Sequence, residues 1–155
     1  MHRPHLRRLG RVWIEDPVYF ITTNVHNRLP VLAADSTAAV LLDEWHHAKR
    51  RHGWLIGRYV IMPDHVHFFT RAAGEERSLE AMMNKWKEWT AKRLLSLRGG
   101  VAPFWQKRFF DHVLRSPASY EERWEYIRMN PVRAKLVARP EDWSYQGFVD
   151  FDGLI

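Results

Sequence analysis

The chain has 155 residues, of which 46% are hydrophobic and 27% charged, and it contains no cysteine. This composition indicates one globular domain and argues against a disordered chain, a membrane-spanning chain and a disulfide-stabilised fold. The formal net charge of +6 favours an anionic partner, because Lys and Arg side chains neutralise phosphates and release the counterions bound to them.

The N-terminal third is predicted to contain an arm, a strand and a helix. Residues 1–11 are basic and lack the apolar stretch of a secretory signal, so we expect a surface arm on a cytoplasmic protein. The β-branched and aromatic residues 19–25 predict a strand. A helix then runs from Asp35 or Ser36 to about His52. Its expected buried stripe consists of Ala39, Leu42, Trp45 and either Ala48 or Lys49.

The middle of the chain is predicted to form a β-hairpin followed by a long helix. Two apolar runs, residues 54–62 and 65–71, are separated only by a Pro-Asp pair suited to a tight turn. Ser78 begins the helix, and two consecutive glycines after residue 98 end it. Residues 104–114 then predict another strand or a pair of short strands.

The C-terminal part is predicted to contain a third helix and a tail. Pro117 opens the helix, which ends near Asn130 because Pro131 disfavours a helical residue before it. Residues 139–155 are expected to pack loosely across the domain. The complete order of elements predicts an α+β fold, a ferredoxin-like antiparallel sheet with packed helices, in a single domain spanning residues 1–155.

His65 and His67 lie two positions apart on the second strand of the predicted hairpin. Successive side chains of a strand alternate faces, so both imidazoles stand on one side together with Phe69. Without cysteine, a metal must be bound by histidine, carboxylate, amide or backbone groups, and two neutral imidazoles at this spacing can reach one cation. The alternative is a pair of half-exposed histidines without a metal, because the pattern alone is weakly specific.

The third predicted helix places its two tyrosines on different faces. Tyr120, Trp124 and Ile127 follow helical spacing and form an apolar stripe that should face the core. Tyr126 and Asn130 lie four residues apart on another face. This arrangement suits a nucleophile beside a metal ligand, whereas the alternatives are a boundary tyrosine and a helix C-cap.

Four segments occur in the order and spacing of one family. They are Pro63-Asp64-His65-Val66-His67, residues 104–109 (Phe-Trp-Gln-Lys-Arg-Phe), residues 126–134 (Tyr-Ile-Arg-Met-Asn-Pro-Val-Arg-Ala) and Trp143-Ser144-Tyr145. Their combination closely resembles the REP-associated tyrosine transposases, which belong to the IS200-like group of HUH endonucleases. The resemblance covers nearly the whole chain from about Tyr19 and implies the HUH endonuclease fold.

The resemblance implies a role for each candidate site residue. His65 and His67 would bind a divalent metal, Mg²⁺ or Mn²⁺, with Asn130 as a third ligand. Tyr126 would be the nucleophile. Tyr120 is a poorer choice because it lies on the core stripe and six residues too early for the family motif.

Two features depart from the relatives. Many of them have Asn where this chain has Asp64, which can be turn chemistry or an extra carboxylate at the metal. Transposases outside the REP-associated group supply Gln as the third ligand, so Asn130 is the least secure of the three.

The resemblance also implies the substrate and the product. Family members bind single-stranded DNA folded into palindromic hairpins, then cleave and rejoin it through a 5′-phosphotyrosine link, with no ATP or other small-molecule cofactor. We predict phosphate contacts from Arg7, Arg8, Arg11, Lys107, Arg108 and Arg133. Trp105 can stack a base or belong to the core, and we favour the core.

Two other functions are consistent with these motifs. One is a hairpin-binding module whose catalytic site is idle, which the intact His65, His67 and Tyr126 argue against. The other is a metallonuclease that attacks with metal-bound water. A His-x-His hydrolase barrel needs about 250 residues and is excluded, and a structural zinc site lacks its four ligands. A monomer and a homodimer are both compatible with the family, as are mobilisation of DNA and a domesticated role.

Overall fold

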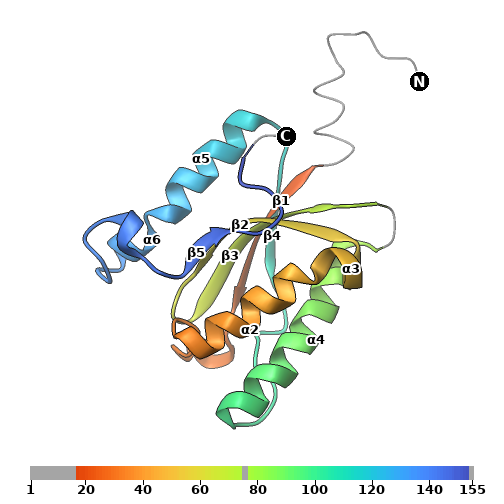
Figure 1. Cartoon of the computed structure of the whole chain (residues 1–155), viewed down its shortest axis with the longest axis vertical. Coiled ribbons are helices and arrows are strands. Elements are labelled where there is room, and N and C mark those ends of the chain that lie inside the picture. The colour runs from red at the N-terminus through yellow and green to blue at the C-terminus, as the bar shows by residue number, and fades with distance from the viewer. Residues whose placement is uncertain (1–16, 75–76, 154–155) are drawn as a thin grey trace.

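A five-stranded antiparallel sheet lies at the centre of the computed structural model, which describes residues 17–74 and 77–153 (Figure 1). The strand order is β4-β1-β3-β2-β5. The strands are β1 (Val18–Asn24), β2 (Trp54–Ile61), β3 (His65–Ala72), β4 (Phe110–Leu114) and β5 (Gln146–Phe148). Every neighbouring pair is antiparallel.

Helices cover both faces of this sheet (Figure 1). They are α2 (Asp35–His46), α3 (Ala48–His52), α4 (Leu79–Arg98), α5 (Pro117–Arg128) and α6 (Asn130–Arg133), with 3-10 turns η2 (His26–Arg28) and η3 (Pro140–Asp142). The helices α2 and α4 lie on one side, and α5 lies on the other. Within the two described ranges, no helix has the length and apolarity needed to cross a membrane.

The predicted fold is confirmed. The elements β1, α2, β2, β3, α4 and β4 follow one another in the ferredoxin-like order, with β1 and β3 at the centre of the sheet. The β2–β3 hairpin begins and ends within one residue of its predicted bounds. Two elements extend this arrangement: β5 adds a strand beside β2, and α5 packs on the face opposite α4.

Helix ends follow the capping residues of the sequence. The Ser78 hydroxyl accepts from the Ala81 N–H at the start of α4. Ser116 caps α5, and Pro117 is its first residue, as predicted. The end of α5 differs slightly from expectation: it ends at Arg128, and Pro131 is accommodated near the start of α6, where its missing N–H has no intrahelical partner to lose.

The predicted buried stripe of the first helix was partly wrong. The helix is interrupted at His47, and its buried residues include Thr37, Ala38, Val40, Leu41, Glu44 and Trp45. Glu44 is only 1% exposed and receives hydrogen bonds from Arg51 (2.8 Å) and Arg93 (2.9 Å). A buried carboxylate paired in this way satisfies its charge, so a position that looks polar in the sequence belongs to the α2–α4 interface.

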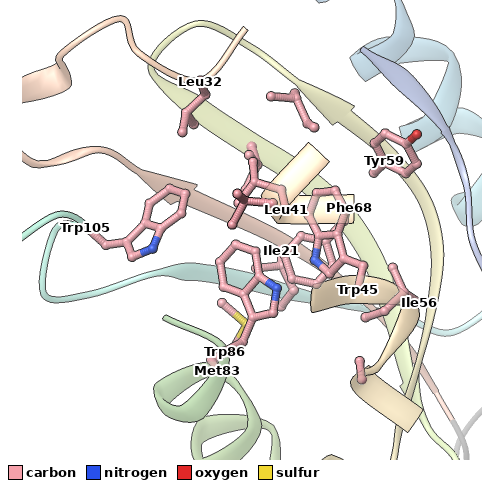
Figure 2. Packing of buried hydrophobic residues seen from close by; sticks show 14 of the residues in the cluster. Ile21, Leu32, Leu41, Trp45, Ile56, Tyr59, Phe68, Met83, Trp86 and Trp105 are labelled. Atoms are coloured by element: carbon pink, nitrogen blue, oxygen red, sulfur yellow. The ribbon is translucent and has the colours of Figure 1, made fainter. Parts of the chain in front are cut away.

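The larger core lies between the sheet and the α2–α4 pair (Figure 2). Trp45 of α2 and Trp86 of α4 stack with ring centroids 5.7 Å apart, and Phe68 of β3 packs against both. Trp105 joins this cluster, is 4% exposed, and donates from its indole nitrogen to the Thr90 hydroxyl (2.9 Å). Our preference for Trp105 as a core residue is confirmed.

The C-terminal segment packs against β2 rather than loosely. The Trp143 indole donates to the Ile61 carbonyl (3.0 Å), and the Asp150 carboxylate accepts from the Ile56 N–H (2.8 Å). A Cβ on Gly57 would lie 2.5 Å from the Phe151 ring, so glycine is what permits this ring to approach the strand. The expectation of a loose tail was wrong because these contacts are long-range and leave no local pattern.

Candidate active site

His65 and His67 share the sheet face covered by α5, and their ring centroids are 4.8 Å apart. The next residue on that face, Phe69, is buried against Tyr120 of α5. On the face of β3 that α5 covers, the side chains therefore change from apolar at Phe69 to polar at His65, next to the turn at Asp64. The prediction that strand alternation brings the two imidazoles together is confirmed.

Each histidine uses its Nδ1 atom in a hydrogen bond. His65 Nδ1 donates to Asp64 Oδ1 at 2.7 Å, and the second carboxylate oxygen accepts from Arg28 Nε at 2.9 Å. His67 Nδ1 lies 2.8 Å from the Thr22 hydroxyl. A carboxylate can only accept, so the Nδ1 atom of His65 carries the proton and its Nε2 keeps the lone pair. Metal-binding histidines are oriented by partners of this kind.

Burial keeps both imidazoles neutral. It lowers the pKa of His67 to about 3, and the charges of Arg123 and Arg133, together with that of His65 when it is protonated, add to the effect. Burial also lowers the pKa of His65, and the hydrogen bond to Asp64 only partly opposes it. Neutral imidazole is the form that binds a metal, so no proton has to be displaced before coordination.

Asp64 ionises readily despite its partial burial. Burial opposes the negative charge, but the hydrogen bonds with His65 and Arg28 outweigh it and lower the pKa of this carboxyl. Both oxygens are thus engaged by other side chains, which makes Asp64 a residue that orients His65.

The donor set fits a catalytic divalent cation better than a closed structural site. In the part of the chain that the structure describes, no three His, Cys, Asp or Glu side chains gather closely enough to hold a metal by themselves. Two neutral imidazoles leave coordination positions for an amide oxygen and for substrate, as catalytic sites require.

The helix α5 separates the two tyrosines as predicted. Tyr120 is fully buried against Phe69 with ring centroids 4.5 Å apart, and burial raises the pKa of its phenol to about 12. Tyr126 is 60% exposed and lines a cavity on the sheet face of the histidines. Only Tyr126 can meet a substrate.

Arg133 connects Tyr126 with Asn130. Its guanidinium carbon lies 4.1 Å from the centroid of the Tyr126 ring, and its Nη2 donates to the Tyr126 carbonyl at 2.6 Å. The same nitrogen donates to the side-chain oxygen of Asn130. A metal bound through Asn130 would share or displace this contact, because the oxygen involved is the same.

Comparison with known proteins identifies the family. The family model for IS200-like transposases matches residues 16–130. The chain belongs to the IS200-like transposases. A REP-associated tyrosine transposase of Escherichia coli (strain K12) is 27% identical over 139 residues, which are 89% of this chain and 80% of the relative. The solved structure of a REP-associated tyrosine transposase bound to a REP hairpin is similar with a TM-score of 0.71 and 23% identity, over 84% of this chain and 75% of that one. The predictions of the family and of a transposase enzyme are confirmed.

The predicted DNA contacts of this transposase lie in different places. Arg133 is beside the candidate nucleophile. Lys107 and Arg108 line a separate cavity of about 850 Å³ together with Tyr19, whose ring packs against the core on the α2–α4 face. Arg7, Arg8 and Arg11 fall outside the described residues. All six stay predictions, and of the three that the structure describes, only Arg133 lies beside the candidate nucleophile.

Sequence reasoning missed the partners that orient the histidines of this transposase. Thr22 and Arg28 lie 45 and 36 residues from the side chains they contact, so no local motif links them. One signal was available. Phe20, Thr22 and Asn24 lie two positions apart on β1 and share one face. The change from an apolar to a polar side chain along this face marks the end of the strand that lies outside the apolar core.

Proposed function

We propose that this transposase binds DNA hairpins and cleaves and rejoins single-stranded DNA through a covalent bond to Tyr126. One observation carries the proposal: Phe20 contacts both His67 and Arg123, and Arg123 lines the cavity of Tyr126. The Arg123 guanidinium lies 4.9 Å from the centroid of the Phe20 ring, Phe20 stacks on His67 at 5.4 Å, and Arg123 lines the same cavity as Tyr126. This continuity supports one reaction site on one face of the sheet.

Tyr126 supplies the nucleophile in this proposal. Its phenolic oxygen attacks the scissile phosphorus and loses its proton to solvent, while the phosphorus–O3′ bond breaks and the departing oxygen takes up a proton. The downstream DNA is left on Tyr126 through its 5′-phosphate, and the upstream DNA ends in a 3′-hydroxyl. A 3′-hydroxyl of another DNA end reverses the step and restores a phosphodiester. Because the bond energy is conserved in the phosphotyrosine, no ATP is required.

His65 and His67 would bind a divalent cation through their Nε2 atoms, and Asn130 would be the third protein ligand. When bound, Mg²⁺ or Mn²⁺ would neutralise charge that develops on the scissile phosphate. Arg133 holds the Asn130 oxygen and the Tyr126 backbone together, so the third ligand and the nucleophile are positioned by one side chain. The neutral histidines and their occupied Nδ1 atoms support this assignment.

The proposed substrate is a palindromic DNA hairpin of the REP type with single-stranded flanks, acted on in the cytoplasm at the nucleoid. The similar solved structure is bound to a REP hairpin, and the net charge of +6 suits a phosphate-rich partner. Lys107, Arg108 and Arg133 are the described basic residues that we expect to contact phosphates, and the N-terminal arginines would add to them.

Trapping of the covalent intermediate tests the mechanism. A REP-type hairpin labelled at its 3′ end is incubated with Mg²⁺ or Mn²⁺, and the products are separated under denaturing conditions. We expect a labelled protein–DNA adduct with the wild type, none with Tyr126→Phe, and an undiminished adduct with the matched control Tyr120→Phe. Cleavage by Tyr126→Phe without an adduct would instead identify hydrolysis by water. Tight hairpin binding without any cleavage would identify a binding module.

We infer that a single chain forms the complete site, because Phe20 of one chain contacts His67 and Arg123, and Arg123 lines the cavity of Tyr126 in the same chain. Mixing His67→Ala with Tyr126→Phe protein distinguishes the two possibilities. The mixture should be as inactive as either variant alone. Restored cleavage would mean that two chains exchange catalytic residues, as in a homodimer with shared sites.

A further inference from the structure

An exposed aromatic ring stands beside the histidine pair at the edge of the sheet. Phe110 is the first residue of β4 and is 54% exposed. It pairs with Thr22 of β1, and Thr22 also pairs with His67 of β3. Residues paired across a sheet point to the same side, so Phe110, Thr22 and His67 form one row on the α5 face.

A cavity of about 370 Å³ lies between β4 and α5, next to this row. It is lined by His112, Leu114, Ser119, Glu122, Arg123 and Tyr126. Phe110 and His112 are two residues apart on β4 and therefore point to the same side. We call Phe110 and these lining residues the β4–α5 groove. Any molecule in the groove lies against Tyr126, so its natural occupant is the substrate.

The ring of Phe20 connects the groove with the histidines. Phe110 contacts this ring edge-on with centroids 6.4 Å apart, the Arg123 guanidinium lies 4.9 Å from its centroid, and His67 stacks on it at 5.4 Å. Phe20 itself is only 3% exposed. The surface left for a ligand at this point is therefore that of Phe110 and the polar groove residues.

We propose that the β4–α5 groove binds one unpaired nucleotide next to the scissile phosphate, with its base stacked on Phe110. The inference rests on the proposed function and adds a position at which the single strand is held. A phenyl ring stacks any base, Arg123 and His112 can donate to a phosphate or a base, and Glu122 can accept from an amino group of the base. Phe110 is a positioning residue that fixes the strand relative to Tyr126.

An abasic scan tests the subsite by binding, independently of cleavage. The probe is a DNA stem-loop with thymidine flanks on both sides, and one flanking base at a time is removed. The proteins carry Tyr126→Phe to prevent reaction. We expect one flanking position at which loss of the base weakens binding by about tenfold, the size of one base–aromatic stack. In Phe110→Ala the same abasic substitution should have almost no further effect.

Phe148→Ala is the matched control. Phe148 is also 54% exposed and lies on β5, the opposite edge strand. This variant should respond to the abasic scan as the parent does, and Phe110→Trp should restore the coupling. Circular dichroism and thermal melting should give similar values for all these proteins, because the rings removed are largely exposed.

Equal responses of Phe110→Ala and the parent at every flanking position would overturn the subsite. A dimer in sedimentation that Phe110→Ala dissociates would also overturn it, because a second copy would then occupy the surface. Failure of the proposed function has a different signature: no covalent adduct forms with the wild type, whatever the abasic scan shows. A subsite that fails alone leaves that adduct intact.

Discussion

The two faces of the sheet differ in how far helices cover them. On the face under α2 and α4, β3 contributes Val66, Phe68 and Thr70, and all three are fully buried. On the face under α5, only Phe69 is fully buried, and the polar His67 and His65 follow it towards the turn. The single long helix α5 leaves one end of its face to the candidate active site, whereas the pair α2 and α4 covers the other face.

Successive residues of β3 therefore have different roles: those on one face stabilise the core, and those on the other face form the candidate active site. His67 and Phe68 are neighbours in the chain, yet one contacts Thr22 and Phe20 at the candidate site while the other packs against Trp45 and Trp86 in the larger core. Substitutions on the two faces should therefore have separable effects on activity and on stability.

The largest effect is expected on the α5 face. His67→Ala should slow formation of the covalent adduct by about a thousandfold, because a lost metal ligand removes several kcal/mol of transition-state stabilisation. Hairpin binding, measured by fluorescence anisotropy, should stay close to the wild-type value, and the free energy of unfolding should fall by only about 1 kcal/mol. A large loss of stability would mean that the α5 face is as structural as the other.

The neighbouring substitution should act on the fold. Phe68→Ala leaves a cavity beside the stacked Trp45 and Trp86 rings and should lower the free energy of unfolding by about 3–5 kcal/mol, measured by urea titration. Under conditions where the variant is still folded, its rate of adduct formation should be near that of the wild type. A strongly reduced rate in the folded variant would contradict the separation of the two faces.

A smaller effect is expected from the groups that orient the histidines. Thr22→Val removes the hydroxyl next to His67 Nδ1 at nearly constant volume. The Mn²⁺ concentration needed for half-maximal cleavage should rise about ten- to a hundredfold, because the orienting partner of a metal-binding histidine is lost. Thr23→Val is the matched control on the other face. Thr23 is fully buried, and its hydroxyl has no hydrogen-bond partner within the described residues, so this control should be neutral or stabilising. Equal metal dependence in both variants would remove Thr22 from the site.

The smallest effect concerns pH and the α2–α4 side. Burial lowers the pKa of His52, and the nearby Arg77 lowers it further. The unfolded chain, with a His pKa of about 6.5, therefore binds more protons below that pH than the folded chain does. Stability should be unaffected by this group above about pH 6.5 and should fall on acidification by at most about 1.4 kcal/mol per pH unit. In His52→Leu, urea titrations across this range should show a shallower decline, and an unchanged slope would exclude His52 as a contributor.

Features that depend on neighbouring residues were predictable. The alternation of β3 placed His65 and His67 together, and the helical period of α5 separated Tyr126 from the buried Tyr120. Ser78 and Pro117 marked the starts of their helices. These predictions succeeded because strand and helix geometry fix the direction of side chains a few residues apart.

The buried stripe of α2 and the packing of the tail were less predictable. Glu44 is buried because Arg51 of α3 and Arg93 of α4 reach it, and Arg93 is far from it in the chain. The tail became ordered through Asp150 and Phe151 filling the space around Gly57. In both cases a residue is buried because of a partner that is distant in the chain, so the local sequence pattern does not predict the burial.

The order of the elements, the pair of histidines on one face and the preference for Tyr126 over Tyr120 as candidate nucleophile could all be inferred from the sequence, because each follows from local periodicity and from motifs at fixed spacing. Only the tertiary structure decided that Asp64 and Arg28 orient His65, that Thr22 orients His67, that Arg133 joins Tyr126 to Asn130, and that Phe110 stands in the row of His67. The contacts of Thr22, Arg28 and Phe110 join distant segments and depend on strand register and packing. The contacts of Asp64 and Arg133 are local, but they depend on the backbone path at the β2–β3 turn and from α5 to α6, which residue spacing alone does not fix.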